Sequence, residues 1–206
     1  SKCAYLEMQD KIEAIDDSLH ISINDKFLNL SHMGYRIIAV AYKNVDAKTS
    51  YSVEDETDLT LLGFLTFTDP PKGDAHDAVT KLKEMGVNTK ILTGDNELVA
   101  RKICDDLKVP VNRVNGGSEL TEMSSTEIKA AVEEATIFAR ITPEQKLDII
   151  KALKANGHVV GFMGDGVNDA PALYEADVGL SVDTAVDVAK EAADIVLLEK
   201  DLLVLA

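Results

Sequence analysis

GDGVNDAPAL, at residues 164–173, determines the architecture that we predict for this chain, because it directly follows the apolar segment HVVGFM at residues 158–163. Glycines on both sides of Asp165 allow the backbone to turn sharply and to direct the carboxylate. Asn168 and Asp169 follow at the end of the same predicted strand. Carboxylates around a phosphate are the usual way in which proteins hold Mg²⁺. An Asp/Asn/Gly turn that caps the next helix is the alternative, but so many such residues after a buried strand fit it poorly.

Strand-like apolar segments alternate with helical segments on both sides of this stretch. Such alternation implies right-handed crossovers and a parallel sheet that is covered by helices on both faces. Ligands of such α/β sheets bind beyond the carboxyl ends of the strands, so polar residues that follow the strands should converge there. The predicted strands cover residues 59–68, 89–92, 136–139, 158–163, 178–182 and 194–198, and the predicted helices cover residues 75–85, 97–107, 126–135, 143–155, 172–176 and 185–192.

The first quarter of the chain has a different character. Helical spacing over residues 26–33 ends at a glycine, and residues 35–45 are rich in β-branched side chains, which predicts a strand. Residues 48–58 are polar and acidic, so we interpret them as a linker or an exposed loop. The sequence therefore predicts a small partial α/β segment at residues 1–57 and a regular α/β domain at residues 58–206.

Thr93, Gly94 and Asp95 directly follow one predicted strand and directly precede a helix. A hydroxyl, a glycine amide and a helix N-terminus together form an anion-binding site. Gly94 also allows the backbone to approach an oxyanion closely. The competing interpretation is a helix cap, which is the commoner use of Thr or Asp at such a place.

Lys146 lies in the first turn of a helix whose start is strongly marked. Thr142 is the expected N-cap, Pro143 takes the first helical position, and Gln145 completes a capping box. A cation there opposes the helix dipole at a cost of about 0.3–1 kcal/mol. Lys146 also begins the apolar stripe of this helix, so it needs a partner such as a phosphoryl group or an aspartate. A lysine that snorkels to solvent is an equally good interpretation of this position.

The composition narrows the classes of function. The 206 residues include 36 Asp and Glu against 21 Lys and Arg, a net charge of −15, which argues against nucleic-acid binding. Cys3 and Cys104 form neither a disulfide framework nor a zinc pattern, so a reducing cytosolic setting is the default. No segment approaches the roughly 18 apolar residues of a membrane helix. The chain begins without Met and stops in an apolar run, so we expect a piece of a longer protein.

A Thr-Gly pair, a lysine and a pair of aspartates at strand ends together suit phosphoryl transfer, which depends on positioning and charge neutralisation. These motifs, preceded by Asp69-Pro70-Pro71, resemble the phosphorylation domain of P-type cation-transporting ATPases, in the haloacid dehalogenase-like superfamily. The resemblance covers residues 59–205 and implies a Rossmann-like parallel sheet. Residues 181–205 are more similar to bacterial magnesium-transporting members than to calcium or proton pumps. Residues 1–57 resemble the end of the nucleotide-binding domain.

The resemblance implies a role for each residue that matches the family motifs around the phosphoryl group. Thr93-Gly94 would bind the phosphoryl oxygens and Lys146 would neutralise their charge. Asp165 would be a direct ligand of Mg²⁺. Asn168 and Asp169 would order the phosphoryl group and the surroundings of the metal, so Asp169 counts with both the catalytic and the metal residues.

The resemblance also implies residues that bind the nucleotide, ATP. Asp95 would lie near its phosphates, Arg140 would contact its ribose, and Arg36 would reach the phosphates from the other domain. Asp69-Pro70-Pro71 would lie near the hinge between the domains, since two prolines stiffen the exit of a strand.

One departure from the family pattern shapes the expected function. The family nucleophile is an aspartate in an Asp-Lys-Thr-Gly motif, which this sequence lacks, because Asp10-Lys11 and Asp25-Lys26 continue differently. Asp69 is a poor substitute, since the prolines after it offer no N–H to a phosphoryl oxygen. We therefore expect a cytoplasmic headpiece fragment of an ATP-driven, membrane-bound cation pump, with Mg²⁺ the favoured cargo. Its partners would be the rest of the polypeptide, including the nucleophile-bearing strand, and we expect it to be inactive alone.

Two other hypotheses come from different functional classes. A soluble phosphatase of the same superfamily would need an Asp-x-Asp motif at its first strand, and the sequence has none at such a position. A non-catalytic module that binds Mg²⁺ or nucleotide as a regulator is the third hypothesis, and titration with either ligand would test it.

Overall fold

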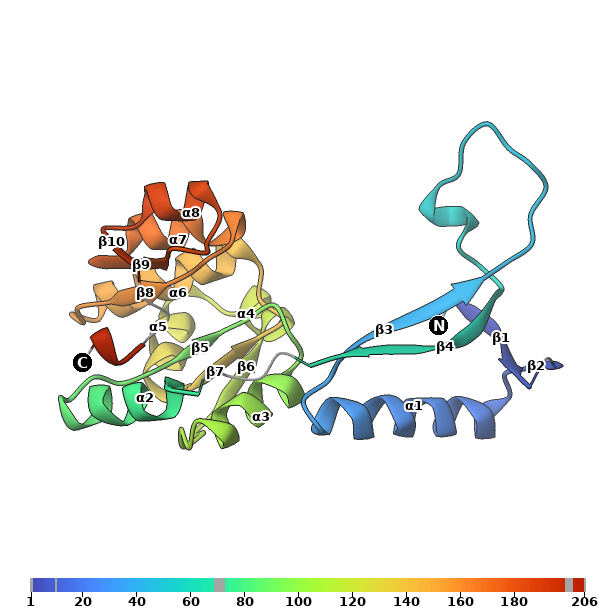
Figure 1. Ribbon diagram of the computed structural model, residues 1–206, viewed down its shortest axis with the longest axis horizontal. Helices are drawn as coiled ribbons and strands as arrows, with labels where there is room; N and C mark the ends of the chain where they lie inside the picture. The colour runs from blue at the N-terminus through green and yellow to red at the C-terminus, as the bar shows by residue number, and fades with distance from the viewer. Residues whose placement is uncertain (1, 10, 69–72, 199–201, 206) are drawn as a thin grey trace. The chain divides into compact units, whose positions relative to one another are not determined.

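The computed structural model describes residues 2–9, 11–68, 73–198 and 202–205 (Figure 1). The chain divides into two compact units, Ser1–Asp69 and Pro70–Ala206. The Asp69-Pro70-Pro71 motif lies outside the described residues, so its predicted place near a hinge stays a prediction.

The first unit is a four-stranded sheet of order β2-β1-β4-β3 that packs against one long helix. β1 pairs parallel with β4, whereas the β1–β2 and β3–β4 pairs are antiparallel. Phe27 of the helix and Phe64 of β4 pack at a ring-centroid distance of 6.3 Å. The elements are β1 (Cys3–Met8), β2 (Lys11–Ala14), α1 (Asp17–His32), β3 (Arg36–Tyr42), the 3₁₀ helix η1 (Val53–Asp55) and β4 (Leu59–Phe67).

Helix α1 is longer than the segment 26–33 that its spacing predicts. It begins earlier because the Asp16 carboxylate accepts a hydrogen bond from the Leu19 N–H at 2.8 Å, which caps the first turn. It ends before Gly34, whose φ of 86° lies in the left-handed region that glycine adopts easily. The predicted end of the helix is therefore confirmed, and the predicted start is nine residues too late, 26 against 17.

Strand β4 belongs to the first unit, although its sequence predicts the first strand of the second domain. It pairs with β3 from Arg36↔Phe67 to Tyr42↔Thr60. Residues 48–58 therefore connect two paired strands, and nearly all of them are exposed, which confirms the exposed-loop interpretation and not that of a linker. The boundary between the compact units falls after residue 69 and not after residue 57, because β4 is bonded on both edges within the first unit.

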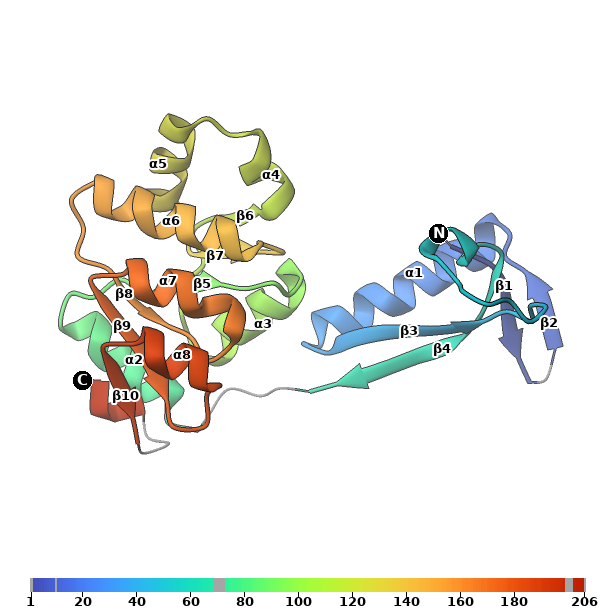
Figure 2. The same ribbon diagram turned by 90° about the horizontal axis from the view of Figure 1, so that it is seen from above.

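The second unit is an α/β fold with two three-stranded parallel sheets, as the predicted fold class requires. The sheets have the orders β5-β7-β6 and β10-β9-β8, and Figure 2 shows the six strands in one succession from β6 to β10. The strands are β5 (Ile91–Leu92), β6 (Val114–Gly116), β7 (Ile137–Ala139), β8 (Gly161–Met163), β9 (Val178–Val182) and β10 (Ile195–Leu197). The helices are α2 (Ala75–Glu84), α3 (Glu97–Asp106), α4 (Gly117–Glu122), α5 (Ser125–Glu134), α6 (Pro143–Ala155), α7 (Ala170–Glu175) and α8 (Asp187–Ala192), with the 3₁₀ helices η2 (Val167–Asp169) and η3 (Leu202–Leu205).

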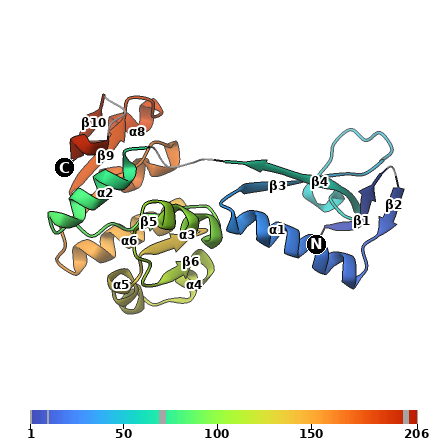
Figure 3. The same ribbon diagram turned by 60° about the horizontal axis from the view of Figure 1, so that its bottom comes forward.

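Helices cover both faces of the sheets and form three apolar clusters. Residues of α2 and α3 pack on one face of β7, against Ile137, and residues of α4, α5 and α6 pack on the other, against Phe138. Residues of α6, α7 and α8 pack against Phe162 of β8. Leu92 of β5 contacts both the Phe138 cluster and the Phe162 cluster, so the two sheets share a core. At the end of the chain, η3 contacts α2 (Figure 3).

No helix in the described part of the chain has both the length and the apolar character that a membrane crossing requires.

Candidate functional site

Lys146 and Asp169 form an ion pair at the carboxyl end of β8. The Lys146 Nζ lies 2.7 Å from the Asp169 Oδ1, and only 15% and 12% of the two side chains are exposed. Lys146 is fixed there by the start of α6, where Thr142 and Gln145 form the predicted capping box. The prediction that Lys146 needs a partner is confirmed for an aspartate, and the snorkelling interpretation is wrong, because this ammonium points into an ion pair.

The second oxygen of Asp169 organises the loop that holds Asp165. Its Oδ2 accepts hydrogen bonds from the Asp165 N–H at 3.3 Å and the Gly166 N–H at 3.2 Å. Gly164 must lack a side chain, because a Cβ there would lie 2.5 Å from the Asp169 Cβ. Ser181 of β9, fully buried, donates a hydrogen bond to the Gly164 carbonyl at 2.9 Å. The loop is thus held from both sides by its own aspartate and by the neighbouring strand.

Asp165 and Asn168 differ from Asp169 in being exposed. The Asp165 carboxylate has no hydrogen bond or ion pair to any residue that the structure describes, while both Asp169 oxygens have partners. The described residues include no group of three or more His, Cys, Asp or Glu side chains placed to hold a metal ion. Mg²⁺ binds few protein ligands and keeps water or substrate oxygens, so one exposed carboxylate beside an ordered loop fits this ion.

Thr93, Gly94 and Asp95 form a turn directly after β5. The Thr93 Oγ1 accepts a hydrogen bond from the Asp95 N–H at 3.0 Å and lies 3.3 Å from the Asp95 Oδ2. The cap of the following helix is Asn96, whose Oδ1 accepts from the Val99 N–H at 3.1 Å. The helix-cap interpretation of Thr93 and Asp95 is therefore wrong, since Asn96 performs that task.

Arg140 is joined to this turn through the backbone. Its N–H donates to the Asp95 carbonyl at 2.8 Å, and the Ile141 N–H donates to the Thr93 carbonyl at 3.2 Å. Its φ of 54° is left-handed, which is uncommon for a bulky residue. The arginine side chain is exposed at the end of β7. These bonds extend the β5–β7 pairing beyond the strands and fix Arg140 beside the Thr93 turn.

The sequence matches a family model described as "Hydrolase: haloacid dehalogenase-like hydrolase" over residues 11–177. The chain belongs to the haloacid dehalogenase-like family. Its relatives include the "Magnesium-transporting ATPase, P-type 1" of Salmonella typhimurium, which is 45% identical over 204 residues, 98% of this chain. The protein of the same name from Escherichia coli (strain K12) is 46% identical over 98% of this chain. A "Calcium-transporting ATPase" from Bacillus subtilis is 42% identical over 83% of this chain.

These relatives are much longer than this haloacid dehalogenase-like chain. The chain spans 22% of the Salmonella protein, 23% of the Escherichia coli protein and 20% of the Bacillus protein. The resemblance to P-type ATPases that the motifs indicate is confirmed, and the magnesium-transporting relatives are 45–46% identical to this chain against 42% for the Bacillus subtilis protein.

The predicted site residues of this haloacid dehalogenase-like domain fall into two connected groups. Lys146, Asp165 and Asp169 are joined directly after β8, with Asn168 in the same loop. Thr93-Gly94, Asp95 and Arg140 are joined after β5 and β7. The two groups follow Leu92 and Met163, which end β5 and β8, and these strands contribute to the same apolar cluster. Arg36 lies in the first compact unit, where it is exposed at the start of β3.

Sequence reasoning missed Ser181, although it bonds the loop of Asp165. The one available signal was a small polar residue inside the apolar strand Val178–Val182. Such a residue needs a partner when it is buried. The partner itself, the Gly164 carbonyl, depends on the pairing of β8 with β9 and is not visible from local sequence.

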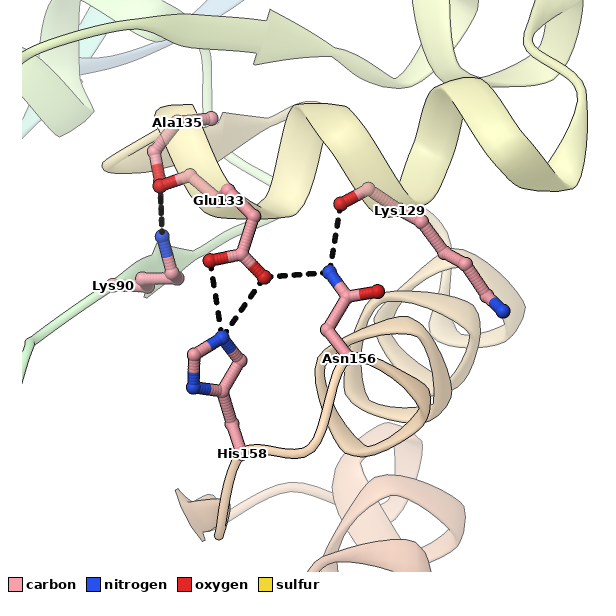
Figure 4. Close-up of polar contacts among 6 residues, drawn as sticks. All are labelled: Lys90, Lys129, Glu133, Ala135, Asn156 and His158. Carbon is pink, nitrogen blue, oxygen red and sulfur yellow. Dashed lines mark hydrogen bonds and ion pairs between the residues drawn. The ribbon is translucent and has the colours of Figure 1, made fainter.

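A second polar cluster of the haloacid dehalogenase-like domain lies at the opposite, amino ends of the strands (Figure 4). Glu133, at the end of α5, is bonded by the Asn156 Nδ2 at 2.5 Å and by the His158 Nε2 at 2.8 Å. These bonds hold the pKa of the Glu133 carboxyl below its usual range. The Lys90 Nζ donates to the Ala135 carbonyl at 2.7 Å, and burial lowers its pKa. This cluster ties the residues that precede β5 and β8 to α5, away from the site.

Proposed function

We propose that this chain is part of the cytoplasmic catalytic headpiece of an ATP-driven cation pump, and that it supports Mg²⁺-dependent phosphoryl transfer to an aspartate outside the chain. The observation that carries the proposal is the buried Lys146–Asp169 ion pair, set in the loop that presents the exposed Asp165 carboxylate. The proposal is further supported by the named relatives, of which this chain covers 22–23% of the length.

Phosphoryl transfer requires charge neutralisation more than covalent chemistry from the protein. Lys146 provides the positive charge, and Asp169 holds its ammonium in place. Asp165 is the residue that would hold Mg²⁺, which supplies further neutralisation of phosphate oxygens. Thr93 and Gly94 offer a hydroxyl and an amide to the phosphoryl oxygens, and Asn168 offers its exposed amide.

The nucleophile is assigned to a strand that this chain does not contain. Among the described residues, β5 pairs only with β7 and β8 pairs only with β9, so each has one edge free for another strand. We infer that the strand bearing the nucleophilic aspartate binds at these edges. Parallel strands end at a common edge, so its carboxyl end would then reach the site.

The nucleotide contacts are assigned to both units. Arg140 and Asp95 of the second unit would contact ATP, and Arg36 would contribute from the first. The first compact unit, which includes β4, would then supply the end of a nucleotide-binding domain, and the second unit would supply most of a phosphorylation domain.

The transported ion is assigned to Mg²⁺. The magnesium-transporting relatives are 45–46% identical to this chain over 98% of it, whereas calcium-transporting relatives that match 83–96% of it are 32–42% identical. The rest of the polypeptide, with its membrane helices, would be the main partner, which places this chain at the cytoplasmic face of a membrane.

The test is to substitute Asp165→Asn in the full-length protein and to measure acid-stable phosphoenzyme from labelled ATP. Losing a metal-binding charge is expected to lower phosphoenzyme formation about a hundredfold. Asp187→Asn is the matched control, because Asp187 is an aspartate of the same unit whose side chain is 90% exposed and paired with Lys190. Normal phosphoenzyme in Asp165→Asn, or equal loss in both variants, would refute the proposal.

A further inference from the structure

Gly117, the first residue of α4, packs directly on the backbone of Arg140. A Cβ at position 117 would lie 2.2 Å from the Arg140 carbonyl oxygen and 2.9 Å from the Gln145 Oε1. Real Cβ atoms essentially never approach backbone so closely, and the oxygen is not at the end of a flexible side chain. Position 117 is therefore open to glycine alone unless Arg140 moves.

The conformation of Arg140 depends on such contacts. Its φ of 54° is sparsely populated by residues with a large side chain, and it persists only where the surroundings hold it. Its N–H is held by the Asp95 carbonyl at 2.8 Å, and its own carbonyl lies against Gly117. The arginine is thus clamped on both sides of its Cα.

Gln145 completes the clamp and connects it to α6. Its Nε2 donates to the Gly117 carbonyl at 2.7 Å and to the Thr121 Oγ1 at 3.1 Å. Its Oε1 accepts from the Thr142 N–H at 3.0 Å, which caps the helix that carries Lys146. The Gln145 side chain therefore links Gly117, at the start of α4, to Thr142, which caps α6. Thr142 follows Arg140 and Ile141 in the chain, and α6 carries Lys146.

We propose that Gly117 and Gln145 are positioning residues for nucleotide binding, which hold Arg140 in its left-handed conformation. Neither residue touches the substrate. Both act by holding the Arg140 backbone, which sets the direction of the Arg140 side chain. This inference rests on the proposed role of Arg140 in binding ATP. It adds that the conformation of Arg140 is imposed by α4 and by the cap of α6.

The conformation is tested first, without nucleotide, on the 206-residue chain. A residue with positive φ gives a strong nuclear Overhauser effect between its own amide and α protons, and Arg140 is expected to show it. Gly117→Ala is expected to abolish it. Gln145→Glu is the milder variant, since Glu keeps the capping acceptor and loses the donor to the Gly117 carbonyl. Gly116→Ala is the control, because the nearest atom to its added Cβ is the Ser118 Oγ at 3.9 Å.

The function is tested in the full-length ATPase with two phosphoryl donors, ATP and p-nitrophenyl phosphate, which has no ribose. Gly117→Ala and Gln145→Glu are expected to raise the KM for ATP about tenfold, the size of one lost charge-assisted contact, and to leave the p-nitrophenyl phosphate reaction unchanged. Neither variant adds to the effect of Arg140→Ala if both act through Arg140.

The outcomes separate this inference from the function on which it rests. An Arg140 that keeps its positive φ in both variants overturns the inference, as does equal loss of both reactions or full additivity with Arg140→Ala. An Arg140→Ala enzyme with unchanged KM for ATP refutes the nucleotide role of Arg140 instead, and the proton measurement still decides whether Gly117 and Gln145 hold its conformation.

Discussion

Gly164 and Asp169 are in such close contact that a Cβ on residue 164 would lie 2.5 Å from the Cβ and 2.9 Å from the Cγ of the aspartate. The glycine thus determines where the carboxylate of Asp169 lies, and through it the Lys146 ion pair and the loop of Asp165. The motif has a steric reason for glycine here, in addition to backbone freedom.

Gly164→Ala is therefore expected to destabilise the chain by about 1–3 kcal/mol, because the added methyl group must displace Asp169. Urea unfolding of the chain measures the change. Gly166→Ala, two residues on, is the control, since the nearest atom to its Cβ is the Asp169 Oδ2 at an ordinary 3.5 Å. A Gly164→Ala chain as stable as the control would show that the loop tolerates the displacement.

Asn115 of β6 is fully buried, and neither its Oδ1 nor its Nδ2 has a hydrogen-bond partner among the described residues. Asn115→Leu is expected to raise the free energy of unfolding by about 1–3 kcal/mol, because it removes the cost of burying an unsatisfied amide. Asn156→Leu should act in the opposite direction, since that amide bonds the Lys129 carbonyl and the Glu133 carboxylate. A loss of stability in Asn115→Leu would contradict this expectation.

Cys104 is fully buried in the cluster of α3, and burial raises the pKa of its thiol to about 11. The thiolate is the reactive form, so Cys104 is expected to resist thiol reagents at pH 8 until the protein unfolds. Cys3 is only partly buried and is expected to react first. Reaction of the native chain with an aromatic disulfide, with Cys3→Ser and Cys104→Ser variants, counts the accessible thiols. Fast labelling of Cys104 in the native state would contradict this expectation.

Glu133 is expected to make the stability of the folded chain sensitive to acid. Bonds from Asn156 and His158 lower its pKa in the folded chain, so the folded state binds this proton less readily than the unfolded state does. The resulting stability is present above the ordinary carboxyl pKa and is lost as the pH falls through the lowered one. Glu133→Gln is expected to make the free energy of unfolding depend less on pH in that acidic range. The charged neighbours of Glu133 are Lys90 and His158.

Urea midpoints between pH 3 and pH 7 measure this pH dependence. Glu122→Gln is the control, because Glu122 is exposed and has no hydrogen-bond or ion-pair partner among the described residues. If the urea midpoints of the parent chain and of Glu133→Gln depend on pH in the same way, Glu133 does not contribute to the acid sensitivity.

Elements with complete local signals were predicted from the sequence. The helix at residues 143–155 is confirmed at both ends, because Thr142, Pro143 and Gln145 mark its start. The strand at residues 178–182 is confirmed as well, since acidic residues on both sides limit an apolar run. In contrast, β6 has three residues, one of them a glycine, and β1 and β2 depend on partners elsewhere in the chain, so local pattern did not predict them.

Pairing and close packing were beyond local signals. The sequence predicted a strand at residues 59–68, but its partners, β1 and β3, come from the pairing of distant segments. The same holds at the site, where the motifs predicted Lys146, Asp165 and Asp169. The roles of Ser181 and Gly117 appear only when strands and helices bring them within bonding distance of Gly164 and Arg140.

We propose that this chain holds the electrostatic half of a phosphoryl-transfer site whose nucleophile lies elsewhere. The most direct measurement is to incubate the chain with γ-labelled ATP and Mg²⁺, quench in acid, and count protein-bound label. We expect no label on the chain alone, because charged partners cannot replace an in-line nucleophile, and we expect label on the full-length protein. Hydroxylamine-sensitive label on the chain alone would reveal an aspartyl nucleophile within it and would contradict the account.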